Sequence, residues 1–145
     1  MFGNKMKRIV VVSLCVIVVG VLVLGWAMFG DRASFHTGLD SYEGLPHTAS
    51  DISIYENKNM SGIFADFKIA EHDFVSFAAT QHWSLQPISG SASVFQAKAF
   101  HEGRSNDKKE VIDGLYYSKR AGNGGGVTVA YDRKDGRGYI DSSSR

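Results

Sequence analysis

An uncharged apolar run near the N-terminus constrains this chain more than any other feature of its sequence. Residues 9–29, IVVVSLCVIVVGVLVLGWAMF, contain no Asp, Glu, Lys or Arg. As a helix rising about 1.5 Å per residue, this run would extend roughly 31 Å, close to the ~30 Å hydrocarbon thickness of a bilayer. The run therefore predicts a transmembrane helix that acts as a signal anchor, with the lipid bilayer as its partner.

The charges beside the run predict its orientation. Residues 1–8 contain three basic side chains and no acid, whereas acids appear soon after the run. Because excess basic charge stays on the cytoplasmic side, residues 1–8 should form a cytoplasmic tail and the remaining chain should lie outside. We therefore expect a single-pass membrane protein with an extracytoplasmic domain. A cleaved signal peptide, which would leave a secreted domain, is the alternative.

Composition limits the partners and cofactors of the exported part. The single cysteine, Cys15, rules out a disulfide within the chain. Three of the 16 basic residues lie in residues 1–8, so the rest of the chain is slightly acidic against its 15 acids. Nucleic acid is therefore not an expected partner, because that affinity comes largely from neutralised phosphates. The histidines show no spacing typical of a metal site, and we expect neither a metal nor a cofactor.

A change in composition separates the apolar run from a folded domain. Residues 30–45 are rich in Gly, Ser, Thr and Asp without a period, which predicts a linker. Residues 46–145 should then form one exported domain. Its clearest strand is GIFADFKI, residues 62–69, in which the side chains of one face are all apolar and those of the other include Asp and Lys.

One helix and several further strands follow. Residues 70–83 switch to helical spacing, and Glu71 and Asp73 fall in the first turn, where the helix dipole favours acids. Ala70 lacks the side-chain oxygen of a good N-cap. Further strands are expected at residues 93–100, 111–119, 126–132 and 137–141. The predicted fold class is α+β, with a mostly antiparallel sheet of four to six strands packed with one helix.

A cluster of glycines resembles a phosphate-binding loop in composition. The stretch AGNGGGV, residues 121–127, lacks the Gly-Lys-Ser/Thr ending of such a loop, and strand-like residues follow it where a helix would be required. It therefore predicts a turn between two strands. Asp135-Gly136 likewise predicts a tight hairpin, because glycine adopts positive φ without steric cost.

No convergent set of nucleophile, base and metal ligands is visible, so we assign no catalytic residue. Four aromatic residues in the C-terminal strands are the candidate binding residues: Tyr116, Tyr117, Tyr131 and Tyr139. Aromatic side chains on one sheet face can form a binding platform for a peptide or a glycan. Core packing and cross-strand pairing are the alternative roles of these side chains, and the sequence leaves both open.

Three stretches of the domain together resemble a family of small, uncharacterised bacterial proteins. They are LPHTASDISIY, FKIAEHDFVSFA and GGGVTVAYDRKDGRGYIDSSSR. Members of the family have an N-terminal anchor followed by one short exported α+β domain, and the resemblance covers most of residues 45–145. It implies a domain in the bacterial envelope, anchored in the inner membrane and facing the periplasm, and brings no catalytic residue.

These observations predict a membrane-anchored, extracytoplasmic, non-catalytic interaction module of the bacterial envelope. Recognition would use an exposed sheet face or edge, with an envelope protein as candidate partner and the oligomeric state left open. The alternative is a small exported hydrolase or ligand-binding protein whose site is assembled from distant residues such as His72, Asp66 and Ser91. The sequence leaves this open because catalytic groups meet in space and not along the chain.

Overall fold

The computed structural model describes residues 16–25, 33–58 and 61–144. The chain divides into two units, residues 1–31 and residues 32–145. In the first unit the described residues form a helix, and their side chains are exposed or, at the last residue, partly exposed. The second unit contains all the strands of the described chain.

The predicted transmembrane helix of residues 9–29 is not supported. Within the described residues no helix is both long enough and apolar enough to cross a membrane. The described part of this helix is residues 16–25. Residues 9–15 and 26–29 of the prediction lie outside the described residues. The predictions of a signal anchor and of a single-pass inner-membrane protein with a periplasmic domain lose their basis with it.

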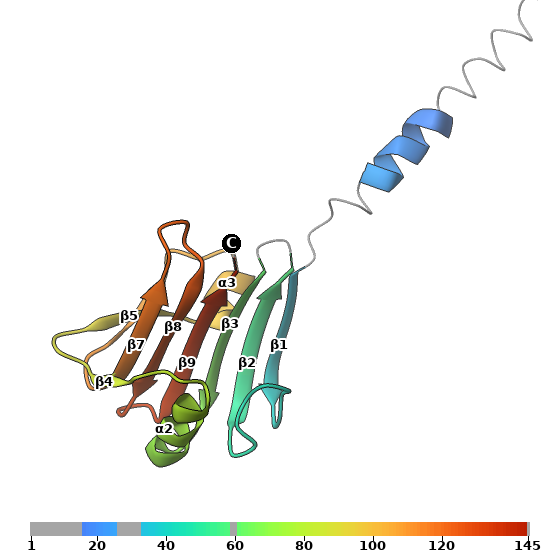
Figure 1. The fold of residues 1–145 in the computed structure, drawn as a ribbon. Coiled ribbons are helices and arrows are strands. Elements are labelled where there is room, and N and C mark those ends of the chain that lie inside the picture. The colour runs from blue at the N-terminus through green and yellow to red at the C-terminus, as the bar shows by residue number, and fades with distance from the viewer. Residues whose placement is uncertain (1–15, 26–32, 59–60, 145) are drawn as a thin grey trace, which may run out of the picture. The chain divides into compact units, whose positions relative to one another are not determined.

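Seven antiparallel strands form one sheet in the second unit, in the order β1-β2-β3-β9-β8-β7-β4 (Figure 1). These strands are β1 Ala33–Leu39, β2 Ser50–Asn57, β3 Gly62–Lys68, β4 Gln86–Pro87, β7 Gly114–Arg120, β8 Gly126–Asp132 and β9 Arg137–Ser143. The other elements are a two-stranded ribbon and two short helices: β5 Ala92–Phe95, β6 Lys108–Val111, α2 Glu71–Thr80 and α3 Ala97–His101.

The predicted α+β class with four to six strands is therefore wrong, because this unit is mostly sheet with few short helices. Part of the difference is β1, which lies in the segment predicted as a linker, residues 30–45. As an edge strand β1 buries none of its side chains fully, so its sequence lacks the apolar alternation of a half-buried strand. The predicted strand at residues 93–100 divides into β5 and α3. Helix α3 starts at Ala97, whose amide donates to the buried Asp66 carboxylate.

Several local predictions are confirmed. Strand β3 and helix α2 lie within the predicted segments, and α2 begins after Ala70 without a side-chain cap. The glycine cluster forms the turn between β7 and β8, where the Ala121 amide donates to the Gly125 carbonyl over 2.8 Å. Gly136 adopts φ 60° in the hairpin between β8 and β9.

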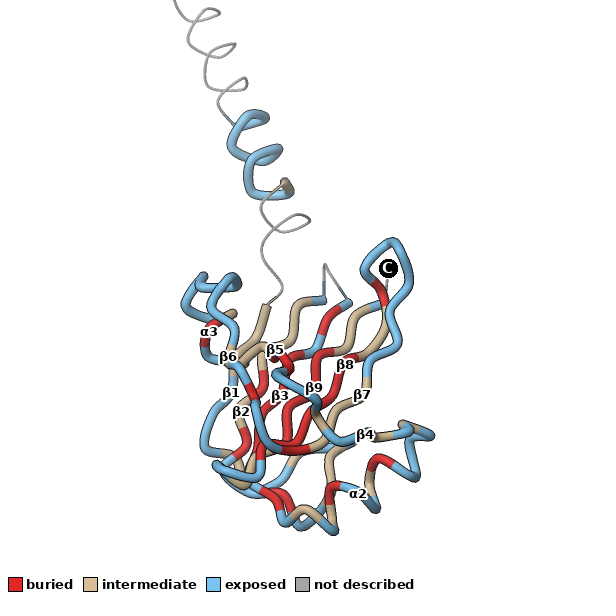
Figure 2. Tube along the Cα trace, turned by 90° about the vertical axis from the view of Figure 1, so that its left-hand side faces the viewer, coloured by how far each residue is buried: buried red, intermediate tan, exposed pale blue. Residues whose placement is uncertain are grey.

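The two faces of the sheet carry different layers (Figure 1). The helix face lies under α2 and carries Ile54, Ala65, Val129 and Ile140, which the strand register aligns across four strands. The opposite face, called the ribbon face, lies under β5, β6 and α3 and carries Phe64, Asp66, Tyr139 and Asp141. Figure 2 shows the buried positions concentrated in the central strands between these layers, while the connecting loops are largely exposed.

Aromatic rings fix both layers to the sheet. On the helix face Phe74 of α2 is fully buried and lies directly over Gly138, where a Cβ atom would come within 2.7 Å of the Phe74 ring. On the ribbon face Phe100 of α3 stacks on Phe64 with ring centroids 3.6 Å apart, and Phe95 meets both rings edge-on. The sheet is therefore packed on both sides, which buries its central strands.

Candidate functional site

A cleft of about 670 Å³ opens on the ribbon face, between the sheet and the chain that leads from β4 into the ribbon. Its floor comes from β7, β8 and β9 and is formed by Tyr116, Ser118, Arg120, Thr128 and Asp141. Its opposite wall includes residues 86–89 and 91–93, and Phe95 and Lys108 of the ribbon complete it. Strands from distant parts of the chain thus build one concave surface with both polar and apolar side chains.

Arg120 holds the floor of the cleft together. Its Nε donates to Thr128 Oγ1 over 2.9 Å, and its Nη1 donates to the Gly124 carbonyl and to Ser143 Oγ over 3.1 and 3.3 Å. Its Nη2 donates to the Asp141 carbonyl over 3.1 Å and lies 2.5 Å from Asp141 Oδ2. A guanidinium has five N–H groups, and these contacts account for all of them. Arg120 therefore fixes β7, β8 and β9 to one another and has no N–H left for a ligand.

The Arg120 contacts leave other polar groups of the floor available. Asp141 pairs with Arg120 through Oδ2, and its Oδ1 has no hydrogen-bond partner in the part of the chain that the structure describes. The hydroxyls of Ser118 and Thr128 lie 2.9 Å apart, and either can donate to the other. Whichever donates, the proton of the second hydroxyl is not used between them. The floor therefore offers an acceptor and a donor side by side.

Electrostatics distinguish Asp141 from the exposed acids of the protein. Burial raises the pKa of Asp141, although the hydrogen bond and charge of Arg120 and the charge of Lys108 act in the opposite direction. Lys108 itself is exposed, with its Nζ 4.7 Å from the centroid of the Phe95 ring and no ion-pair partner among the described residues. The cleft thus combines one buried, arginine-paired carboxylate with one exposed ammonium group.

Two serine hydroxyls of the cleft wall bond to the carboxylate of Glu110. The Ser93 hydroxyl donates to Glu110, and this bond and a second one from Ser91 lower the pKa of Glu110. A carboxylate with a lowered pKa is a weak general base near neutral pH. Glu110 therefore gives either serine little activation as a nucleophile.

The predicted binding tyrosines divide between the two faces of the sheet. Tyr116 and Tyr139 lie on the ribbon face, and Tyr117 and Tyr131 lie on the helix face. Only Tyr116 of the four lines the cleft. Tyr131 is buried and donates to the Ile69 carbonyl over 3.1 Å, and Tyr139 is buried with Lys109 Nζ 5.4 Å from the centroid of its ring. The period-two alternation of a strand already requires neighbours such as Tyr116 and Tyr117 to point to opposite faces.

The residues of the predicted hydrolase alternative are not brought together. The exposed His72 ring contacts Asp73, its neighbour on α2, with Nε2 3.1 Å from Oδ1. Asp66 is buried and pairs with Arg137, whereas Ser91 lines the cleft. Within the described residues no hydrogen bond or ion pair joins any two of His72, Asp66 and Ser91. The sequence offered no signal for Arg120 and Asp141, which meet only through strand pairing.

Comparison with protein families, with curated proteins and with solved structures finds no match to this chain. The resemblance of residues 45–145 to small anchored bacterial proteins therefore stays a prediction. Function has to be inferred from the geometry and chemistry of the cleft.

We predict that the stability of the protein falls with acid, and that Asp141 opposes this fall. Ion pairs lower the pKa values of Asp51, Glu71 and Asp135, so their stabilising effect is lost as pH decreases. The raised pKa of Asp141 has the opposite sign, because the folded state binds that proton more tightly than the unfolded state. The free energy of unfolding should therefore fall from about pH 5 to about pH 3, and fall more steeply in Asp141→Asn.

Urea denaturation at several pH values in this range measures both slopes. Asp40→Asn is the matched control, because Asp40 is exposed and lies outside these ion pairs. A slope for Asp141→Asn equal to or shallower than that of the wild type would contradict the assignment of an opposing effect to Asp141.

Proposed function

We propose that this protein is a non-catalytic interaction module that binds a polar segment of a partner in the cleft on the ribbon face. The observation that carries the proposal is that some polar groups of the cleft floor hold the strands together while others have no partner among the described residues. Arg120 is used fully to fix three strands, while Asp141 Oδ1 and one hydroxyl proton of the Ser118–Thr128 pair stay available. A preformed concave surface with a few oriented polar groups is typical of a binding site.

The cleft chemistry also defines the kind of group that would fit. Asp141 Oδ1 accepts a hydrogen bond from a ligand N–H or O–H, and the hydroxyl pair donates one to a ligand oxygen. Lys108 attracts an acidic group, and the Tyr116 ring offers an apolar contact. A ligand with both donors and acceptors and a negative charge would satisfy these groups together.

We expect Ser91→Trp to abolish binding by filling the cleft. Ser91 is exposed on its wall, so the indole can occupy the hollow without displacing the core. The full-length protein is screened against phage-displayed random dodecapeptides and a glycan array, and affinities for the hits are measured by calorimetry. Affinity should fall about tenfold or more, a difference of roughly 1.4 kcal/mol or above in binding free energy.

Ser105→Trp is the matched control, because Ser105 is also exposed but does not line the cleft. It should bind like the wild type. If the wild type binds no peptide and no glycan, or if Ser91→Trp binds as tightly as Ser105→Trp, the cleft is not a binding site and the proposal is wrong.

A further inference from the structure

One strand that forms the cleft has an edge that is only partly covered. Strand β7 pairs with β8 along its whole length, from Gly114 to Arg120. On its other side β4 pairs only with Leu115 and Tyr116. Beyond Tyr116 the outer edge of β7 therefore has no neighbouring strand in the described part of the chain.

Two hydrogen bonds show which backbone groups of β7 point outward. The Ile88 amide, on the β4 side, donates to the Gly114 carbonyl over 3.0 Å, and the Ala121 amide donates toward β8, to the Gly125 carbonyl. In an antiparallel ladder, successive residues direct their N–H and C=O groups to opposite sides. The even-numbered residues of β7 therefore direct these groups away from β8.

Ser118 and Arg120 are the even-numbered residues beyond the reach of β4. Each presents an outward amide and an outward carbonyl, and none of these groups has a backbone partner among the described residues. Both residues are exposed. Such an edge is a template on which another chain can form a strand.

The open edge continues directly into the cleft. The side chains of Ser118 and Arg120 form part of the cleft floor, and Ser89 and Ser91 belong to the wall that faces it. A strand laid along this edge would extend the sheet, so every second side chain would point to the ribbon face and toward the cleft. The edge would supply backbone hydrogen bonds, and the cleft would select side chains.

Positive charge lies on both sides of the edge. Lys119 of β7 points to the helix face, is exposed and has no ion-pair partner in the described residues. Lys108 lies on the ribbon face at the cleft, also without an ion pair to any described residue. An added strand would thus meet an ammonium group on each of its two faces. Lysines on an edge disfavour pairing with a neutral or basic strand and favour an acidic one.

We infer that the partner segment is an extended acidic peptide, which adds a strand to the β7 edge at Ser118 and Arg120 and directs alternate side chains into the cleft. This inference rests on the proposed function and names the ligand class of the same site. It requires no rearrangement of the β7–β8 pairing, because the backbone groups involved are not used there.

A backbone scan of the bound peptide tests strand addition. Dodecapeptides selected by phage display on the full-length protein are synthesised with one amide N-methylated at a time, which removes a hydrogen-bond donor and leaves the side chain. We expect selected peptides rich in Asp and Glu. N-methylation at alternate positions should weaken binding about tenfold, and the positions between should change it about twofold or less.

Ser118→Pro tests the protein side of the same contact. It removes an outward N–H that β8 does not use, so the β7–β8 ladder can stay intact. Both Ser118→Pro and Ser118→Ala lack the hydroxyl, but only Ser118→Ala keeps the amide. We therefore expect peptide affinity to be about tenfold lower for Ser118→Pro than for Ser118→Ala. Circular dichroism melting checks the fold of Ser118→Pro, and the N-methyl scan decides the matter if that variant does not fold.

The outcomes separate this inference from the proposed function. If Ser91→Trp abolishes binding but the ligands are glycans only, or N-methylation shows no period of two, the cleft is a binding site and strand addition is wrong. Normal peptide binding by a folded Ser118→Pro variant also overturns strand addition. If Ser91→Trp leaves all binding unchanged, the proposed function itself fails.

Discussion

Replacing Gly114 with alanine should destabilise the second unit by about 3 kcal/mol or more. An added Cβ atom would lie 1.7 Å from the Tyr131 carbonyl oxygen, and Gly114 has φ 155°. The clash is with backbone of the paired strand β8, so no side-chain rotation can relieve it. The free energy of unfolding, measured by urea denaturation followed by circular dichroism, gives the loss directly.

Gly122→Ala is the matched control for this substitution. Gly122 lies in the turn at the other end of the β7–β8 hairpin, and a Cβ atom added there would meet nothing within 4 Å. We expect it to change stability by about 0.5 kcal/mol or less. Equal effects at Gly114 and Gly122 would mean that the start of β7 relaxes easily. Because Ile88 bonds to the Gly114 carbonyl, that start also positions the cleft wall.

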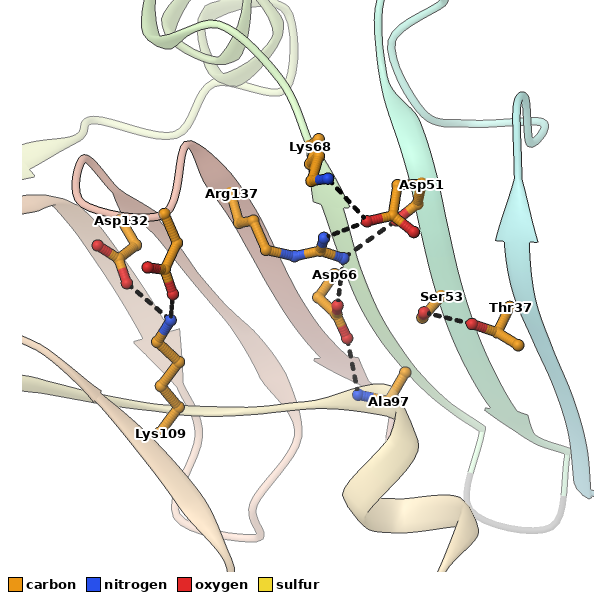
Figure 3. Close-up of polar contacts among 10 residues, drawn as sticks. Thr37, Asp51, Ser53, Asp66, Lys68, Ala97, Lys109, Asp132 and Arg137 are labelled. Atoms are coloured by element: carbon orange, nitrogen blue, oxygen red, sulfur yellow. Dashed lines mark hydrogen bonds and ion pairs between the residues drawn. The ribbon is translucent and has the colours of Figure 1, made fainter.

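Replacing Asp66 with alanine should cost about 3 kcal/mol. The Asp66 carboxylate is buried on the ribbon face and connects two layers (Figure 3). Its Oδ1 accepts from Arg137 Nη2 over 2.7 Å, and its Oδ2 accepts from the Ala97 amide over 3.1 Å at the start of α3. The substitution would leave Arg137 with one carboxylate fewer in a largely buried site and the Ala97 amide without its acceptor.

Asp51→Gly isolates the effect of burial, because Asp51 pairs with the same arginine at a half-exposed position (Figure 3) and glycine tolerates the positive φ of 47° found there. Exposed ion pairs contribute little, so this variant should lose about 1 kcal/mol or less. Urea denaturation compares the two, and hydrogen exchange should show faster exchange of the α3 amides in Asp66→Ala only. A loss in Asp51→Gly as large as that in Asp66→Ala would contradict a special role for the buried carboxylate.

The elements that could be predicted from the sequence are those whose signal is local. Strand β3 and helix α2 have apolar side chains at the period of their own structure, and the turns before β8 and β9 have glycines where the backbone needs them. Strand β1 has no such signal, because its stability comes from pairing with β2 at an edge. Its local sequence therefore predicts a linker.

The start of α3 shows why some elements need distant partners. Residues 93–100 have an apolar pattern that fits a strand, but the Ala97 amide bonds to a carboxylate 31 positions earlier in the chain. The hydropathy of residues 9–29 likewise predicts an element that the described structure does not support, a transmembrane helix. An apolar run indicates that a helix could span a bilayer, but among the described residues no helix is both long enough and apolar enough to do so.

The sequence by itself determined strand β3, helix α2 and the tight turns, since each depends on residues within a few positions of one another. Only the tertiary structure decided the cleft and the open edge of β7. Arg120 meets Asp141 across two strand pairings, and the uncovered backbone of Ser118 depends on where β4 ends. Such contacts arise from the order and register of strands, which side-chain periodicity alone does not specify.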